Sequence, residues 1–101
     1  MHAMIRRYKT GSVGEVVKRI EKDFLSVITS APGFIAYYVI DESNGMQSSI
    51  SIFENKEYAE YSNRLAEYWV KEHAGFLLDS PDYTSGDVVV YREQDVKAIA
   101  V

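Results

Sequence analysis

The residues best suited to chemistry lie near a single tryptophan, Trp69, which His73 follows one helical turn later. Trp69 could form the wall of a pocket for a flat ligand, and His73 could serve as a base or a ligand. The plainer alternatives are core packing for Trp69 and a structural or surface position for His73. The other histidine is His2, and neither has a partner at metal-ligand spacing. The sequence therefore predicts no dedicated metal site.

Tyrosine is abundant, with eight residues in the chain. Tyr37 and Tyr38 are adjacent in a segment typical of a strand, so they must point to opposite faces of the sheet. A buried phenol needs a hydrogen-bond partner, which Ser49, Ser51 or Arg7 could supply. Amphipathic packing is the simpler explanation of these tyrosines. The alternative is an aromatic-lined pocket whose phenols orient a polar ring.

Two arginines, an asparagine and one more tyrosine complete the candidates. Arg6 and Arg7 are neighbours, so one faces each side of its strand, and the buried one must be paired with a structural carboxylate or an anionic substrate. Asn63 could polarise an oxygen, or could cap or face solvent. Tyr58 shares a helical stripe with Trp69. No catalytic residue is assigned, and the candidate pocket residues are Trp69, His73, Tyr37, Tyr38, Arg7, Ser49, Ser51, Asn63 and Tyr58.

Composition limits the classes of function. The chain has 101 residues, which fits one domain, and 47% of them are hydrophobic, as in ordinary globular proteins. Its net charge of −4 argues against nucleic-acid binding, which relies on Lys and Arg. The absence of cysteine excludes disulfides, thiolate metal sites and a cysteine nucleophile. We find neither a membrane-spanning run nor an apolar signal core, and we expect a cytoplasmic protein.

The periodicity of the chain predicts six elements. Ser12 with Glu15 forms a capping box for the first helix, and Asn55 is a natural N-cap for the second. Asn44-Gly45 predicts a tight turn between two strands. The predicted elements are a strand over 2–9, a helix over 13–29, strands over 34–40 and 46–53, a helix over 56–74 and a strand over 88–91. This βαββαβ order predicts an α+β, ferredoxin-like fold, in which two helices cover one face of a four-stranded antiparallel sheet.

The predicted strands over 34–40 and 88–91 are apolar on both faces. Two helices can cover only one face of a sheet, so the other face needs a cover that this chain does not contain. We therefore expect a homodimer in which the open sheet faces pack together. Residues 1–92 form the expected domain, and the tail over 93–101 could pair with the partner subunit.

Three segments, PGFIAYY (residues 32–38), SISIFE (49–54) and AEYWV (66–70), resemble the antibiotic-biosynthesis-monooxygenase-like family. The resemblance covers residues 2–92 and is nearest to a branch without assigned activity. It implies a dimeric α+β barrel. Two enzyme groups share this fold: one oxidises polycyclic aromatic substrates with dioxygen and no cofactor, and the other degrades haem.

The residues associated with these two groups match only in part. The first group has an Asn four residues before the tryptophan, where this chain has Leu65. The second uses an Asn on the first strand, which is absent here, and a His further along the helix than His73. Three hypotheses follow: binding of a small, ring-shaped molecule with cofactor-independent oxidation, a non-catalytic structural or ligand-sensing dimer, and haem binding or degradation. We expect no cofactor, with haem as the weakest alternative.

Overall fold

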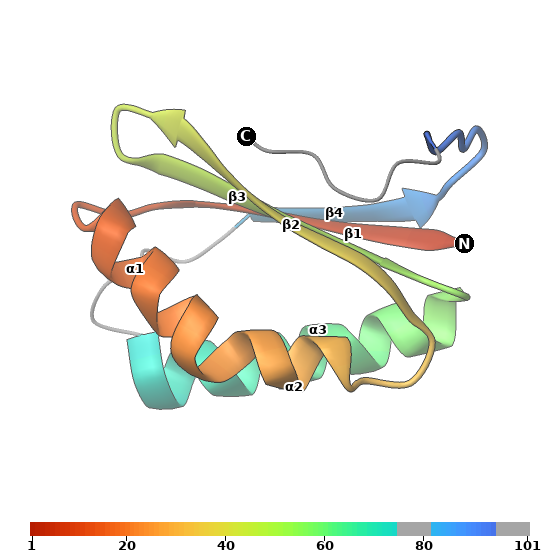
Figure 1. Cartoon of the computed structure of the whole chain (residues 1–101), viewed down its shortest axis with the longest axis horizontal. Helices are drawn as coiled ribbons and strands as arrows, with labels where there is room; N and C mark the ends of the chain where they lie inside the picture. The colour runs from red at the N-terminus through yellow and green to blue at the C-terminus, as the bar shows by residue number, and fades with distance from the viewer. Residues whose placement is uncertain (75–81, 95–101) are drawn as a thin grey trace.

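The computed structural model describes residues 1–74 and 82–94. A four-stranded sheet forms one layer and two helical segments form the other, and the two layers lie face to face (Figure 1). The elements in chain order are β1 (His2–Lys9), α1 (Val13–Arg19), the π-helical turn η1 (Ile20–Phe24), α2 (Leu25–Thr29), β2 (Phe34–Ser43), β3 (Met46–Phe53), α3 (Lys56–Trp69), the π-helical turn η2 (Val70–Ala74) and β4 (Asp82–Asp87). The predicted order and ferredoxin-like fold are confirmed.

The sheet is antiparallel throughout and has the strand order β2-β3-β1-β4. β1 is central and pairs with both β3 and β4, so Met4 lies between Ser51 and Ser85. The β2–β3 hairpin closes at the predicted turn, where Asn44 and Gly45 have φ values of 54° and 76°. Only glycine and a few polar residues adopt this region readily, which explains the sequence of the turn.

The two helical segments begin where the sequence predicts. The Asn55 side chain caps α3 by accepting a hydrogen bond from the Tyr58 amide at 2.9 Å. The capping box predicted for α1 is wrong, although Ser12 is the N-cap residue, because its side chain makes no capping hydrogen bond. The Glu15 side chain instead pairs with Arg19 at 3.2 Å, one turn further along the helix.

Every second residue of β1 points to the helices. The helix-facing side chains His2, Met4, Arg6 and Tyr8 are all buried, while Ile5, Arg7 and Lys9 are exposed. On β2, Tyr37 and Val39 pack against the buried core. The predicted division of Tyr37 and Tyr38 between the two faces is therefore confirmed.

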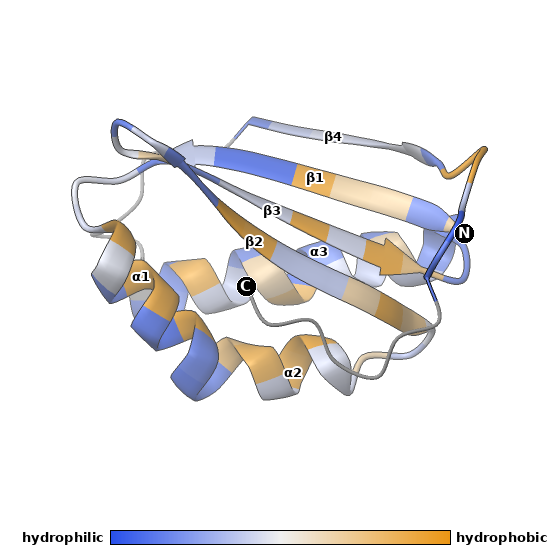
Figure 2. Cartoon of the chain, turned by 45° about the horizontal axis from the view of Figure 1, so that its top comes forward, coloured by the Kyte–Doolittle hydropathy of each residue, from blue (hydrophilic) through white to orange (hydrophobic). Residues whose placement is uncertain are grey.

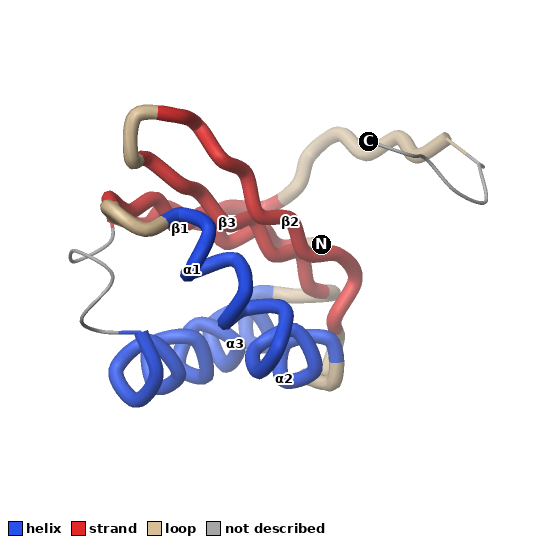
Figure 3. Tube along the Cα trace, turned by 60° about the vertical axis from the view of Figure 1, so that its left-hand side comes forward, coloured by secondary structure: helices blue, strands red, loops and turns tan. Residues whose placement is uncertain are grey.

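The opposite face of the sheet carries apolar side chains, and no helix of residues 1–74 or 82–94 covers it. Ile5, Tyr38 and Ile40 project from this face with exposed fractions of 41%, 55% and 42%. Figure 2 brings this side of the sheet forward and shows hydrophobic segments along β1, β2 and β3, and Figure 3 shows both helical segments on the other side. The structure thus confirms that the strand over 34–40 is apolar on both faces.

The last strand differs from the sequence prediction. We expected it over 88–91, but β4 is Asp82–Asp87, and Val89 and Val90 are 89% and 85% exposed. The reason is the register of the pairing with β1. β4 pairs with β1 from Asp82 to Asp87, and the Val88 amide then bonds to the Met1 carbonyl at 2.9 Å. The polar segment before the valine run therefore forms the strand. Most of the predicted tail, residues 95–101, lies outside the described part of the chain.

Candidate functional site

A cavity of about 40 Å³ lies between the helices and the sheet. Its helical wall is mostly apolar and includes Phe24 and Trp69, with Asn63 as a polar member, and its sheet side carries the polar groups of Arg6, Tyr37 and Ser49. A space of this size holds about three water molecules. A six-membered ring needs more room, so ring binding requires side chains of the wall to rotate.

The first helical segment supplies its part of the wall through residues spaced by four: Val16, Ile20, Phe24 and Ile28, all buried. In a regular α-helix, residues four apart drift by about 40° around the axis at each step. The π-helical turn η1 takes in an extra residue per turn and offsets this drift. The wider turn therefore keeps the whole stripe facing the sheet.

Trp69 is the main aromatic group of the cavity. Its side chain is buried, and its ring centroid lies 5.2 Å from that of Phe24. Within the described residues, the indole Nε1 of Trp69 has no hydrogen-bond partner. A buried donor without a partner is unfavourable by about 1–3 kcal/mol, so this atom suits an acceptor on a bound molecule.

Arg6, rather than the predicted Arg7, is the arginine of the cavity. It is 6% exposed, and its Nη2 donates to the side-chain oxygen of Asn63 and, at 3.4 Å, to the Asn63 carbonyl. The Asn63 amide in turn donates to Glu67 at 3.2 Å. Burial lowers the pKa of Arg6, and the negative charge of Glu67 opposes that shift. An arginine remains protonated at neutral pH even so.

Two phenols complete the polar side of the cavity. Burial raises the pKa of Tyr8 to about 12, against the opposing effect of the Arg6 charge. Burial also raises the pKa of Tyr37, with a smaller contribution from Tyr8 in the same direction. Both phenols are therefore protonated at neutral pH. They can donate hydrogen bonds to a ligand, and they do not serve as bases there.

Five of the sequence-predicted residues surround this one cavity. They come from the sheet and from α3, and they are Tyr37, Ser49, Ser51, Asn63 and Trp69. Asn63 does not simply face solvent, as one alternative held, since its side chain bonds Arg6. Each of these positions follows from the face that its strand or helix turns toward the other layer.

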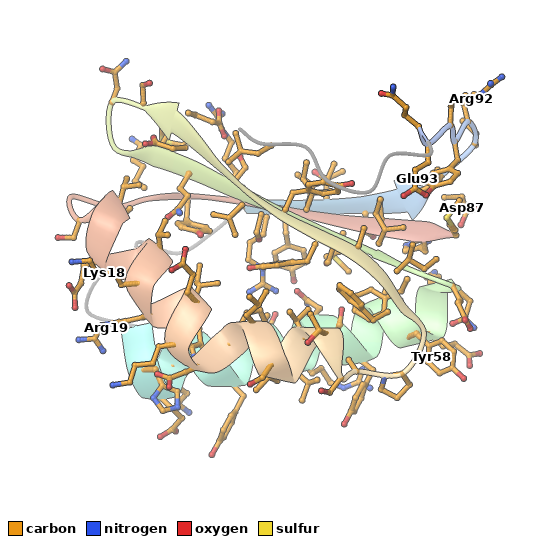
Figure 4. All side chains as sticks on the ribbon, in the orientation of Figure 1. Lys18, Arg19, Tyr58, Asp87, Arg92 and Glu93 are labelled. Carbon is orange, nitrogen blue, oxygen red and sulfur yellow. The ribbon has the colours of Figure 1, made fainter. Side chains whose placement is uncertain are left out.

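The other four predicted residues lie outside the cavity. Arg7 and Tyr38 project from the open sheet face, because each follows an inward-facing residue on its strand. Tyr58 packs over Gly33 at the end of the helical layer (Figure 4). His73 is exposed, and the centroid of its ring lies 5.9 Å from that of the Trp69 ring.

Arg6 and Tyr8 are the ionisable residues lining the cavity that are missing from the nine sequence-predicted candidates. The signal for them is the alternation of β1, since Arg6 shares a face with Met4 and Tyr8. The β3 partners of Arg6 and Met4 are small: Arg6 pairs with Ser49 and Met4 with Ser51. Small side chains beneath an arginine leave the space that the structure shows.

The described residues do not fit a bound haem. The imidazole of His73 is exposed, and His2 is engaged at the far end of β1 by Asp87, through its Nδ1 at 3.0 Å. Neither lines the cavity, whose volume is far below that of a porphyrin.

Over residues 1–74 and 82–94, no three His, Cys, Asp or Glu side chains gather into a metal site. No helix in that part of the chain is long and apolar enough to span a membrane.

Comparison of sequences yields one curated relative, and no family model matches the chain. The serine/threonine-protein kinase ksg1 from Schizosaccharomyces pombe is 31% identical over 78 residues, which cover 73% of this chain. The matched region is 13% of the kinase, so this chain corresponds to a small part of that protein's length.

Solved structures give more extensive matches. The NE2512 protein of unknown function from Nitrosomonas europaea superposes with a TM-score of 0.75 at 12% identity, over 94% of this chain and 95% of that one. A monooxygenase from the ActVA-Orf6 gene of Streptomyces coelicolor, in complex with nanaomycin D, has a TM-score of 0.74 at 10% identity, over 93% and 92%. The haem degrader MhuD from Mycobacterium tuberculosis has a TM-score of 0.72 at 16% identity, over 92% and 100%.

A dimeric ferredoxin-like protein from an uncultured marine organism has the same fold, with a TM-score of 0.70 at 13% identity over 92% of this chain and 98% of that one. These structural neighbours are antibiotic-biosynthesis-monooxygenase-like proteins, as the sequence resemblance implies, and they include monooxygenases, haem degraders and proteins of unknown function. Identities this low establish architecture and leave activity to the site itself. The chain therefore has the ferredoxin-like fold of the dimeric α+β barrel proteins.

Proposed function

We propose that the protein is a cytoplasmic homodimer whose subunits each bind a small, ring-shaped molecule in the cavity between helices and sheet. The observation that carries this proposal is the wall of the cavity. It combines the rings of Phe24 and Trp69, which lie in contact at an interplanar angle of 43°, with an indole Nε1 that no described residue satisfies. An apolar pocket with a few convergent polar groups is the usual form of a small-molecule site.

Oxidation of the bound ring by dioxygen, without a cofactor, is the reaction that this site would support. An activated ring CH₂ group reacts with O₂ to give a ring carbonyl and water. Two C–H bonds break, one oxygen atom forms the C=O bond, and the other leaves as water with both hydrogens, so the carbon supplies all four electrons. The protein would position the ring, exclude water and stabilise the developing oxyanion through Arg6 and the phenols.

The open sheet face supports the dimer. Ile5, Tyr38 and Ile40 are exposed on one continuous antiparallel sheet, and in the described residues no helix covers them. A second copy of the same face would bury these side chains by aligned sheet packing. Dimers are typical of proteins with this fold.

A non-catalytic, ligand-sensing or structural dimer is the second candidate. It is favoured by the size of the cavity, which is about 40 Å³ and so nearly filled by its own side chains. The two candidates share a dimer and differ in turnover.

Native mass spectrometry of the purified protein, with a denatured control, tests both parts of the binding proposal. We expect a dimer that carries a small extra mass, which disappears on denaturation. A bare monomer would contradict the proposal. Oxygen uptake with an anthrone substrate then separates the candidates: uptake that is lost in a folded Trp69→Ala variant supports the oxygenase, and no uptake supports the sensing dimer.

A further inference from the structure

We propose that the ring-shaped ligand carries a negatively charged oxygen group, and that Arg6 is the residue that binds it. This inference rests on the function proposed above, because it specifies the class of molecule that the same cavity takes. It derives from the burial of the Arg6 guanidinium and from the hydrogen-bond donors that line the cavity around it.

The guanidinium of Arg6 is buried without a counterion in contact. Its side chain is 6% exposed, and among the described residues no carboxylate oxygen lies within 4.0 Å of it. The nearest carboxylate compensation is Glu67, which reaches Arg6 only through the amide of Asn63. The Arg6 guanidinium carbon also lies 6.0 Å from the centroid of the Tyr83 ring, a weak cation–π contact that does not replace a counterion. Burial of a charge without a paired counterion is strongly unfavourable, so a site of this kind is completed by an anion.

The free donors of Arg6 have the geometry to receive such a group. Nη2 is engaged by Asn63, while Nε and Nη1 have no hydrogen-bond partner in the part of the chain that the structure describes. A guanidinium presents its donors as a planar fork, which matches the two oxygens of a carboxylate. Asn63, held in turn by Glu67, is the positioning residue that fixes the plane of this fork.

The rest of the cavity wall is rich in donors and contains no acid. None of the described lining residues is Asp or Glu, although the chain as a whole has a net charge of −4. Tyr8, Tyr37 and the indole Nε1 of Trp69 can all donate to an oxygen at neutral pH. The cavity is thus a positively charged, donor-lined space, which selects anionic over neutral rings.

The neighbouring arginine shows how the same side chain is neutralised when it has no ligand to bind. Arg7 Nε donates to both oxygens of Glu42 at 3.1 Å, and its Nη2 lies 3.0 Å from Oε1. Arg7 occupies the opposite face of the same strand. It is therefore a matched control for Arg6, differing by one residue in position and lying outside the cavity.

The test compares two ligands of nearly the same shape, 2-naphthoate and 2-naphthamide, by isothermal titration calorimetry at pH 7. In the wild-type protein we expect 2-naphthoate to bind about tenfold or more tightly, the effect of one charge-assisted hydrogen-bonded pair. We expect Arg6→Met to abolish this preference, Arg6→Lys to retain part of it, and Arg7→Met to leave it intact.

Each outcome has one meaning. Binding of both ligands with equal affinity in the wild-type protein overturns the anion proposal and leaves ring binding standing. Failure of both ligands to bind overturns the proposed function and this inference with it. A preference that survives in a folded Arg6→Met variant shows that another residue binds the anion. If Arg6→Met does not fold, the wild-type ratio and the Arg6→Lys ratio decide the matter.

Discussion

Replacing Tyr8 by phenylalanine tests the buried polar side of the cavity through its effect on stability at high pH. Tyr8 is 5% exposed, and burial raises its pKa from 10.0 to about 12. Between these two values the phenol ionises in the unfolded chain and stays protonated in the folded one. The protonated phenol therefore contributes stability that is complete below pH 10 and is lost as the pH rises toward 12.

The magnitude follows from the two pKa values. At pH 8 the phenol is protonated in both states. At pH 11 its ionisation in the unfolded chain raises the equilibrium constant for unfolding about tenfold relative to pH 8. The loss between pH 8 and pH 11 is thus about 1.4 kcal/mol, and it approaches about 2.7 kcal/mol above pH 12. Tyr8→Phe keeps the ring and removes the ionisable group, so the variant should lose about 1.4 kcal/mol less than the wild type over that interval.

The assay is urea denaturation of both proteins at pH 8, 9, 10 and 11, at equal protein concentration because the proposed dimer would unfold with concentration dependence. Tyr68→Phe is the matched control, since Tyr68 is 66% exposed. Parallel stability curves for the wild type and Tyr8→Phe, with no divergence by pH 11, would show that the Tyr8 phenol is solvated and would refute its place in the cavity wall.

Three further predictions address other parts of the molecule. Arg6→Met should lower the free energy of unfolding at pH 7 by no more than about 1 kcal/mol, or should raise it, because the change removes a buried charge that lacks a contacting carboxylate. A loss above about 3 kcal/mol would identify Arg6 as a structural residue. Tyr38→Glu places a charge on the open sheet face and should convert the proposed dimer to a monomer in analytical ultracentrifugation, and an unchanged dimer would exclude this face as the interface. Gly33→Ala should destabilise the fold by more than about 2 kcal/mol, since Gly33 has a φ of 74° and a Cβ there would lie 2.2 Å from the Tyr58 ring. The same change in a Tyr58→Ala background should have a smaller effect, and equal effects would rule out the steric cause.

The order of elements was predictable because its signals are local. The stripe of Val16, Ile20, Phe24 and Ile28, the cap at Asn55 and the turn at Asn44-Gly45 each lie within a few residues of sequence. The position of β4 was not predictable in this way. Its position is determined by its register with β1, which is distant in the sequence, and the β-branched run after Asp87 gave a stronger local signal than the polar strand itself.

The cavity was predictable only in part. The alternation of β3 predicts that Ser49 and Ser51 share a face, but it does not say which face meets the helices, and only the structure places them at the cavity. Trp69 follows from the helical stripe. The choice between Arg6 and Arg7 was not evident, because β1 carries apolar residues on both faces: Met4 toward the helices and Ile5 on the open side. The contact that decides it, from Arg6 to Asn63, joins residues 57 positions apart and depends on how α3 lies across the sheet.

The measurement that tests the binding site most directly is a ¹H–¹⁵N correlation spectrum during titration with 2-naphthoate. Trp69 is the only tryptophan of the chain, so a single indole resonance reports on the cavity wall. We expect this resonance to shift and to saturate at one ligand per subunit, since the Nε1 donor gains an acceptor and the rings of the wall rotate. A spectrum in which the indole resonance stays in place while the ligand binds elsewhere, or in which no resonance moves, would contradict a binding site between the helices and the sheet.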